Sequence, residues 1–227
     1  MSNTREISTN LISKIYQGHS FEQSILLEKK FQRLEKRDKS FVTLILLNTL
    51  RRNGQIDSII SKLAKKPFKK KDYFLKNLLR ISISQILFLD MPHHPIVDIA
   101  VEISKKYGSE KFVNAILRNI CRNKKALLSE IPKHLNIPNW IKRDIIGQFD
   151  PKDLEQIASQ IIKEPFLDIK IKSKEFKSKD WVKILKGKHI FDNLIRIKES
   201  KNIESLPYFE KGLWWIQGLS ATLPVTI

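Results

Sequence analysis

The strongest chemical signal in the sequence is a dense cluster of cations near the middle of its first half. Six lysines stand within ten residues, interrupted by Leu63, Ala64, Pro67 and Phe68. Ammonium groups at this density are suited to phosphates, and they position a nucleic acid without reading its sequence. A solvated loop would have the same composition, so both interpretations remain open here. The six are Lys62, Lys65, Lys66, Lys69, Lys70 and Lys71.

Further cations stand at the C-terminal ends of several expected helices. A guanidinium can fork onto a phosphate, which favours a nucleic-acid contact. A cation at a helix C-terminus also interacts favourably with the helix dipole, by about 0.3–1 kcal/mol, which offers a purely structural alternative. Arg80 differs because it lies within an apolar helical face, so we expect it to be buried and paired with a carboxylate or with helix ends. The candidates for contact are Arg51, Arg52, Arg118, Arg122, Lys124 and Lys125.

The charge distribution supports a polyanionic partner. The chain has 42 basic and 24 acidic residues, a formal net charge of +18. Residues 1–125 carry +14 of this excess and residues 126–227 carry +4. Lysine outnumbers arginine 32 to 10, a bias that an AT-rich genome also produces. Such a bias should not favour one half of the chain, so the asymmetry indicates a nucleic-acid partner for the first half.

Other chemistries find little support. The only cysteine, Cys121, has no Pro-Cys context and no histidine near it in sequence, so we expect an inert, buried thiol. His93 and His94 are adjacent, lack acidic or cysteine partners at ligand spacing, and are better explained by a turn between two prolines. The seven glycines form no phosphate-binding loop. We therefore expect no metal, no cofactor and no catalytic residue in this chain.

The sequence also indicates the cellular compartment in which the protein is expected. One cysteine allows no intramolecular disulfide, which fits a reducing environment. The first residues contain no apolar signal-peptide core, and the longest apolar stretch, Ile81–Leu89, is too short to span a bilayer. A cytoplasmic protein is the expectation.

The first 125 residues are predicted to be helical throughout. Capping-box spacing occurs at Asn3 with Glu6 and at Ser20 with Gln23. A nearly all-apolar helix from Asp72 to Leu89 belongs at the centre of a bundle. The other predicted helices are one with Ile7, Leu11 and Ile15 on one face, one from Phe21 towards Leu34, one capped by Asp38 and stopped by Gly54, one from Ile56 to Leu63, one ending near Tyr107-Gly108 after the loop Met91–Pro95, and one from Ser109 carrying Phe112, Ile116 and Ile120.

From about residue 126 the pattern changes. Asn139 and Asp150 are typical caps of two short helices, and Pro151 suits a first helical position. Apolar and charged residues then alternate along 167–172, which predicts a half-buried strand. A helix over 178–186, stopped by Gly187, and strands at 193–198 and 213–217 follow. The fold class is therefore mainly α, a helical bundle followed by a small, incomplete α+β segment, divided at 1–128, 129–164 and 165–227.

Four short stretches together resemble a known domain. The stretch around Asn114 predicts a mid-helix amide that bonds to a neighbouring helix or loop, because such a residue is unfavourable unless its side chain is satisfied. As a set, the stretches resemble the all-helical, RNA-binding NusB-like domain in the form that opens the RsmB/Sun family of ribosomal RNA cytosine-C5 methyltransferases. They are Arg37-Asp38-Lys39-Ser40-Phe41-Val42, Leu50-Arg51-Arg52, Leu79 to Phe88, and Phe112-Val113-Asn114-Ala115-Ile116-Leu117-Arg118.

Later segments resemble the part that joins this domain to the family's catalytic core. Arg51 to Asp57 and Gln85 to His94 look more like the methyltransferase form than like free-standing NusB, and Pro138–Ile141, Glu164–Lys170 and Leu206–Gly212 continue the likeness. Gln217-Gly218 is similar to the family's Gln-Asp motif ahead of the cofactor domain, with glycine where aspartate is usual.

The resemblance implies an RNA-binding N-terminal region of a 16S ribosomal RNA cytosine-C5 methyltransferase, with Arg5 where the family places basic residues that meet RNA. It implies S-adenosylmethionine in a full-length parent, whose cofactor loop and two catalytic cysteines have no counterpart here, so we expect RNA binding without methylation and a truncated chain. The alternatives are a free-standing NusB-like antitermination or ribosome-assembly factor that binds RNA with a protein partner, and an interaction module with no RNA role.

Overall fold

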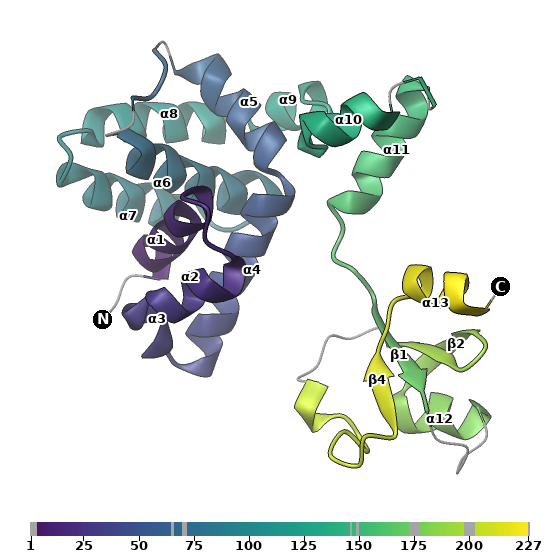
Figure 1. Ribbon diagram of the computed structural model, residues 1–227. Helices are drawn as coiled ribbons and strands as arrows, with labels where there is room; N and C mark the ends of the chain where they lie inside the picture. Colours follow the sequence, from purple (N-terminus) through teal and green to yellow (C-terminus); the bar gives the residue numbers. More distant parts are fainter. Residues whose placement is uncertain are drawn as a thin grey trace. The chain divides into compact units, whose positions relative to one another are not determined.

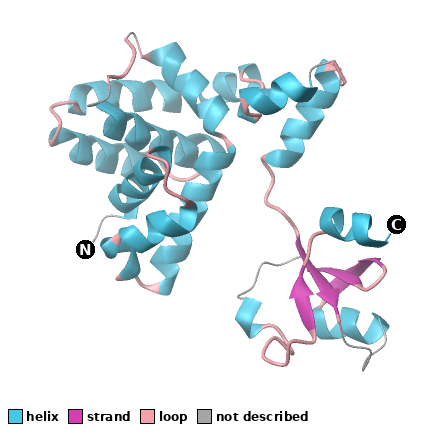
Figure 2. Ribbon diagram, viewed as in Figure 1, coloured by secondary structure: helices cyan, strands magenta, loops and turns pink. Residues whose placement is uncertain are grey.

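The computed structural model describes residues 4–64, 66–69, 72–145, 147–148, 150–172, 178–197 and 203–226. The chain divides into two compact units, Met1–Lys163 and Glu164–Ile227 (Figure 1). The first unit is helical, and the described strands all lie in the second (Figure 2). The mainly-α fold with a small α+β part, expected from the sequence, is thus confirmed.

The first unit is a bundle with one central helix. Helix α6, Tyr73–Ile83, is buried along most of its length, as the apolar run predicted. The helices before and after it pack around it in two apolar clusters, one centred on α1 and α4 and the other on α5, α7 and α8. The remaining helices of the bundle are α1 Thr4–Tyr16, α2 Phe21–Leu27, α3 Lys29–Gln32, α4 Lys36–Arg51, α5 Asn53–Leu63, α7 His93–Lys105, α8 Glu110–Arg122 and α9 Lys124–Glu130.

The central helix ends in an irregular turn that the sequence did not predict. Residues Ser84–Phe88 form a π-helical turn, η2, closed by a hydrogen bond from the Leu89 amide to the Ser84 carbonyl of 3.2 Å. Gln85 in this turn is fully buried, and its side-chain amide donates to the Ile81 carbonyl. A π-turn inserted in an α-helix shifts the side chains that follow it, so it re-aims Phe88 and Leu89.

Several predicted helix ends differ from the observed ones. The capping box at Ser20 and Gln23 is present, whereas Asn3 of the other predicted box lies outside the described residues. The single helix expected from Phe21 to Leu34 is broken at Glu28, whose backbone leaves the helical region. Glu28 is buried and its carboxylate pairs with Lys14 at 2.9 Å, a tertiary contact that local sequence could not reveal.

Three other boundaries were also predicted wrongly. Helix α4 begins at Lys36 behind Glu35, so Asp38 lies in its first turn and does not cap it. Gly54 does not stop α4, because it belongs to the first turn of α5. His93 and His94 begin α7 directly after Pro92, so the expected turn is shorter than Met91–Pro95. Pro95 fits there because the first helical turn needs no amide donor.

A short helical segment completes the first unit. It contains the 3₁₀ turn η3 Lys133–Asn136, helix α10 Asn139–Ile145 and helix α11 Pro151–Ile161. Asp150 precedes α11 and Pro151 takes its first position, as predicted. The η3 turn packs against α5. Residues 131–137 therefore belong structurally with the bundle.

The second unit is built on an antiparallel sheet with the order β2-β3-β1-β4. Strand β1 is Leu167–Ile171, β2 Gly187–Phe191, β3 Leu194–Ile197 and β4 Trp214–Ile216. Helix α12, Ser178–Leu185, packs on one face through Trp181 and Leu185. The 3₁₀ turn η4 Ile203–Ser205 and helix α13 Leu219–Thr226 complete it. The predicted strands at β1, β3 and β4 are confirmed, whereas β2 and α13 were not predicted.

Candidate nucleic-acid interface

The lysine cluster between α5 and α6 is only partly available for a ligand. Lys66 and Lys69 are exposed, and no ion pair involves either of them within the described part of the chain. Lys62 instead pairs with Glu130 at 2.7 Å, with both side chains more than half exposed. Lys65, Lys70 and Lys71 lie outside the described residues. The described cations of this cluster that face solvent without an acidic partner are thus Lys66 and Lys69.

Lys66 borders an apolar groove. The groove has a volume of about 570 Å³, and Lys66, Pro67, Phe68, Phe112, Ile116 and Asn119 are among the residues that line it. The rings of Phe68 and Phe112 meet edge-on, with centroids 5.9 Å apart. Ile116 and Ile120 are buried as predicted, but Phe112 is 40% exposed. An aromatic ring beside an exposed lysine is a surface on which a nucleobase can stack while its phosphate contacts the ammonium group.

Arg5 on α1 is half-buried and serves the core as well as the surface. Its Nε donates to Oε1 of the buried Gln85 at 2.9 Å. Burial lowers the pKa of Arg5 from its usual value. The π-turn that carries Gln85 therefore fixes the guanidinium against the bundle, and only part of the side chain remains open to solvent.

The neighbours Arg51 and Arg52 have different surroundings. The Arg52 guanidinium carbon lies 4.3 Å from the centre of the Phe88 ring, and its Nη1 donates to Gln55 Oε1 at 3.3 Å. Burial lowers the pKa of Arg52. Its Nε is buried without a hydrogen-bond partner among the described atoms. Arg51 ends α4, is partly exposed and has no acidic partner in the described residues.

The cations of α8 and α9 also divide into engaged and free groups. Arg118 is exposed, and its Nε donates to Asn114 Oδ1 at 2.8 Å along the same helix. The Asn114 amide oxygen thus accepts from its own helix, where we had expected a bond to another element. Lys124 forms an ion pair with Asp90, and this hydrogen bond and charge hold the pKa of that carboxyl below its usual value. Arg122 and Lys125 are exposed.

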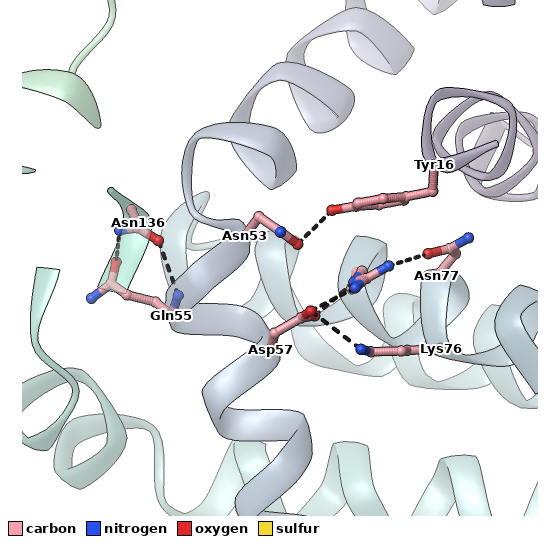
Figure 3. Close-up of polar contacts among 8 residues, drawn as sticks. Tyr16, Asn53, Gln55, Asp57, Lys76, Asn77 and Asn136 are labelled. Atoms are coloured by element: carbon pink, nitrogen blue, oxygen red, sulfur yellow. Dashed lines mark hydrogen bonds and ion pairs between the residues drawn. The ribbon is translucent and has the colours of Figure 1, made fainter. Parts of the chain in front are cut away.

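A polar network centred on the buried Arg80 links α1, α5 and α6 (Figure 3). Arg80 is 8% exposed and grips Asp57 with two hydrogen bonds, Nε to Oδ1 at 2.7 Å and Nη2 to Oδ2 at 2.6 Å. Its Nη1 donates to Asn77 Oδ1, and its guanidinium lies 4.1 Å from the centre of the Tyr16 ring. The structure therefore confirms Arg80 as a buried, paired arginine.

The pKa values of Asp57 and Tyr16 in this network differ from their usual values. Burial would raise the pKa of Asp57, but hydrogen bonds and charge from Arg80, with a contribution from Lys76, outweigh it and hold the pKa below its usual value. Burial raises the pKa of Tyr16 to about 12, and its hydroxyl donates to Asn53 Oδ1 at 2.5 Å. These groups are fully engaged with one another, so they stabilise the bundle and are not positioned to bind a ligand.

The polar contacts continue on the side of α5 that faces the η3 turn. Gln55 donates from its side chain to the Ile131 carbonyl at 3.0 Å, and its Oε1 accepts from Asn136 Nδ2 at 2.9 Å. The backbone N–H of Gln55 donates to Asn136 Oδ1 at 3.0 Å. The first turns of α5 thus contact α1 and α6 on one side and η3 on the other (Figure 3).

Sites for a metal or a reactive thiol are not prominent. Among the residues the structure describes, there is no group of three or more histidine, cysteine or acidic side chains able to hold a metal ion. Cys121 is half-buried, and burial raises the pKa of its thiol. No described helix is long and apolar enough to cross a membrane.

Comparison with protein families assigns the first unit. The NusB family model matches residues 2–122, more than half of the chain. The chain belongs to the NusB family.

Individual relatives extend the similarity beyond the family match. The ribosomal RNA small subunit methyltransferase B of Klebsiella pneumoniae (strain 342) is 23% identical over 233 residues, covering 96% of this chain and 53% of the relative. The protein of the same name from Escherichia coli (strain K12 / MC4100 / BW2952) is 24% identical over 234 residues, with 96% and 54% covered. The chain thus spans about half the length of the curated relatives it matches.

A solved structure shares the fold. The crystal structure of PH0851 superposes with a TM-score of 0.55 at 14% sequence identity, covering 96% of this chain and 53% of that one. At this identity the likeness concerns the fold alone.

Proposed function

We propose that this chain is the RNA-binding N-terminal region of a 16S ribosomal RNA cytosine-C5 methyltransferase. The observation that carries the proposal is the reach of the similarity. The NusB match ends at residue 122, yet the small subunit methyltransferase B relatives align over 96% of the chain. That alignment includes the antiparallel unit, which a free-standing NusB-like antitermination factor would not require.

The chemistry of the surface supports RNA as the ligand. Lys66, Lys69, Arg122 and Lys125 offer exposed cations for phosphates, and Phe112 offers a ring for stacking. Arg5 and Arg118 add partly engaged guanidinium groups, and Arg51 adds a partly exposed one. Their combined role is to hold small-subunit ribosomal RNA, so that a target cytosine can be presented to a catalytic domain. The proposed set of RNA-contacting residues also includes the largely packed Arg52 and four further lysines, Lys65, Lys70, Lys71 and Lys124.

Methyl transfer itself belongs, in this proposal, to the part of such a methyltransferase that this chain does not match. That part would bind S-adenosylmethionine. The residues of this chain do not fit the cofactor, because the seven glycines are scattered singly along the sequence and form no glycine-rich loop that would cradle it. We therefore assign no catalytic residue and no cofactor contact to this chain, and we place its work in the cytoplasm.

We assign three parts to this task. Residues 1–128 bind RNA, residues 129–164 connect, and residues 165–227 form an α+β segment ahead of a catalytic domain. The contacts of Gln55 with Ile131 and Asn136 support a connecting segment that begins docked on the RNA-binding bundle.

A salt titration with matched variants tests the proposal. Affinity of the purified chain for a small-subunit ribosomal RNA hairpin is measured from low to high salt, beside an unrelated hairpin of equal length. The double variant Lys66→Gln, Lys69→Gln should lower the salt slope by about 1.4–1.8, because each lost phosphate contact removes about 0.7–0.9. The control Lys179→Gln, Lys183→Gln changes the same charge on exposed positions of α12 and should leave the slope unchanged.

Three results of this titration would contradict the proposed function. Equal affinity for both hairpins would reduce the chain to a non-specific polycation binder, and no binding at low salt would remove the RNA role. Specific binding that appears only when a second protein is added would favour the free-standing NusB-like factor.

A further inference from the structure

A second group of cations lies on α3 and the start of α4, away from those singled out in the sequence. The group, here called the α3–α4 patch, has five exposed side chains and one partly exposed one. Between residues 29 and 39 there are six cations and only two acids, a net charge of +4. The patch consists of Lys29, Lys30, Arg33, Lys36, Arg37 and Lys39.

The patch is not neutralised by its surroundings. No ion pair to any of its six side chains is found among the residues that the structure describes. Glu28, the acid that directly precedes the patch, is buried and engaged with Lys14 at 2.9 Å. Only Glu35 and Asp38 remain as acids within the stretch, so several of the cations must face solvent together.

The placement of two of these cations opposes helix stability. Lys36 and Arg37 occupy the first turn of α4, where the helix dipole is positive and a cation is unfavourable by about 0.3–1 kcal/mol. Glu35 at the N-cap makes no side-chain capping bond, and Asp38 is the one acid in the same turn, so the first turn gains little from this arrangement of charge. The stability of α4 therefore does not account for this charge, in contrast to Arg51 at the other end of the same helix.

The patch is also distinct from the first candidate surface. Helix α4 has 16 residues, so its two ends are about 22 Å apart at a rise of 1.5 Å per residue. Figure 1 shows α2 and α3 at the opposite end of the first unit from the α5–α6 connection. That connection contains Lys66 and Lys69. A ligand that touches both must be extended.

We propose that the α3–α4 patch is a second phosphate-contacting site, which binds the backbone of the same RNA held at the α5–α6 and α8 surface. The inference rests on the proposed function and adds to it a second, sequence-independent contact. RNA is an extended polyanion, so it can meet both surfaces at once. Arg33 and Arg37 supply forked donors to phosphate oxygens, and the lysines supply point charges.

The test compares two triple variants that lose the same charge. Lys29→Gln, Lys30→Gln, Arg33→Gln removes half of the patch from exposed positions, and Lys179→Gln, Lys183→Gln, Lys188→Gln removes three exposed cations from the second unit. The probe is a small-subunit ribosomal RNA hairpin, titrated across salt. The patch variant should lower the salt slope by about 2–2.7, at about 0.7–0.9 per contact, and the control should match the unmodified chain.

A second variant separates binding from folding. Lys36→Gln, Arg37→Gln should weaken RNA binding while leaving the thermal midpoint equal to or above that of the unmodified chain, because it removes cations from a positive helix end. A loss of binding accompanied by unfolding would contradict the account.

The outcomes distinguish this inference from the proposed function. If the unmodified chain binds the hairpin but the patch variant has the same slope as the control, the second site is refuted and the first surface stands. If the unmodified chain does not bind the hairpin, the proposed function fails. If RNA binding is unchanged but the patch variant alone loses binding to vesicles containing anionic phospholipid, the patch belongs to a membrane surface and the RNA inference is overturned.

Discussion

Gly54 and Leu135 approach so closely that no side chain fits between them. A Cβ at Gly54 would lie 1.8 Å from the Leu135 carbonyl oxygen and 2.9 Å from the Asn136 amide nitrogen. Gly54 lies in the first turn of α5, and Leu135 belongs to η3. With the hydrogen bonds of Gln55 to Ile131 and Asn136, this contact fixes the segment after the bundle against α5. The Arg51–Asp57 stretch thus joins the helical bundle to the segment that follows it.

Gly54→Ala should therefore destabilise the first unit by about 1–3 kcal/mol, the usual effect of overpacking a filled site. The direction is informative, because alanine in a helix would otherwise stabilise by about 1 kcal/mol. Urea unfolding measures the effect. Gly218→Ala is the control, since no atom lies within 4 Å of its added Cβ. Unchanged stability in Gly54→Ala would show that the contact yields without consequence.

Asp57→Asn should destabilise the bundle strongly. The substitution leaves the buried, charged guanidinium of Arg80 without its carboxylate counter-ion, and breaking such a pair typically costs about 3–5 kcal/mol. Asp57 is itself 29% exposed, so the lower end is expected. Thermal unfolding reports the change, with Asp98→Asn on the exposed face of α7 as the control. A loss no larger than that of the control would contradict the buried-pair account.

The same carboxylate predicts a pH dependence. The pKa of Asp57 is lower in the folded chain than its ordinary value of 3.8, so the folded state favours the ionised form. This stability is present above about pH 4 and is lost as the pH falls through the folded-state pKa. Asp57→Asn should thus flatten the stability curve below pH 4. An equally steep acid transition in the variant would assign it to other carboxylates.

Asp168→Asn should loosen α13 in the second unit. Asp168 is 4% exposed, binds Arg196 at 2.6 and 2.9 Å, and accepts from the Leu219 amide at 3.2 Å. Neutralising it weakens the anchor at the first residue of α13. Hydrogen exchange over residues 219–226 should rise at least several-fold, since one kcal/mol changes an opening equilibrium about fivefold. Asp192→Asn, which alters the pair between the exposed carboxylate of Asp192 and the half-buried Lys170, should leave that exchange unchanged.

Replacing Arg51 by glutamine should change RNA binding, whereas the same replacement at Arg52 should change the stability of the fold. Arg51→Gln should lower the salt slope of RNA binding by about 0.7–0.9 with little effect on stability. Arg52→Gln removes the contact with the Phe88 ring and should destabilise by about 1–2 kcal/mol. Paired unfolding and binding measurements separate the two. A slope change for Arg52 without loss of stability would reverse the assignment.

The sequence predicted the central helix, the capping box at Ser20, the alternating strand β1 and the pairing of Arg80, because each depends on a local pattern. It failed where distant residues decide the outcome. Glu28 leaves the helix while paired with Lys14, Gly54 is required by Leu135, and Asp168 is buried because Arg196 pairs across the sheet. The alternation along β1 had placed Asp168 in solvent.

The sequence predicted which cationic residues could contact a nucleic acid, but it could not predict which of them are already paired within the protein. Lys62, Lys124 and Arg52 were indistinguishable from free cations until their partners Glu130, Asp90 and Phe88 were located. The α3–α4 patch was overlooked because its cations are interleaved with acids, and only the burial of Glu28 shows how little neutralises them.

Footprinting of the purified chain on small-subunit ribosomal RNA measures whether the chain holds that RNA at a defined place. We expect a discrete protected region in that RNA, which survives competition by large-subunit ribosomal RNA and shrinks when Lys66 and Lys69 are replaced by glutamine. Protection spread evenly over both RNAs, or none at low salt, would contradict the claim that this chain positions small-subunit RNA.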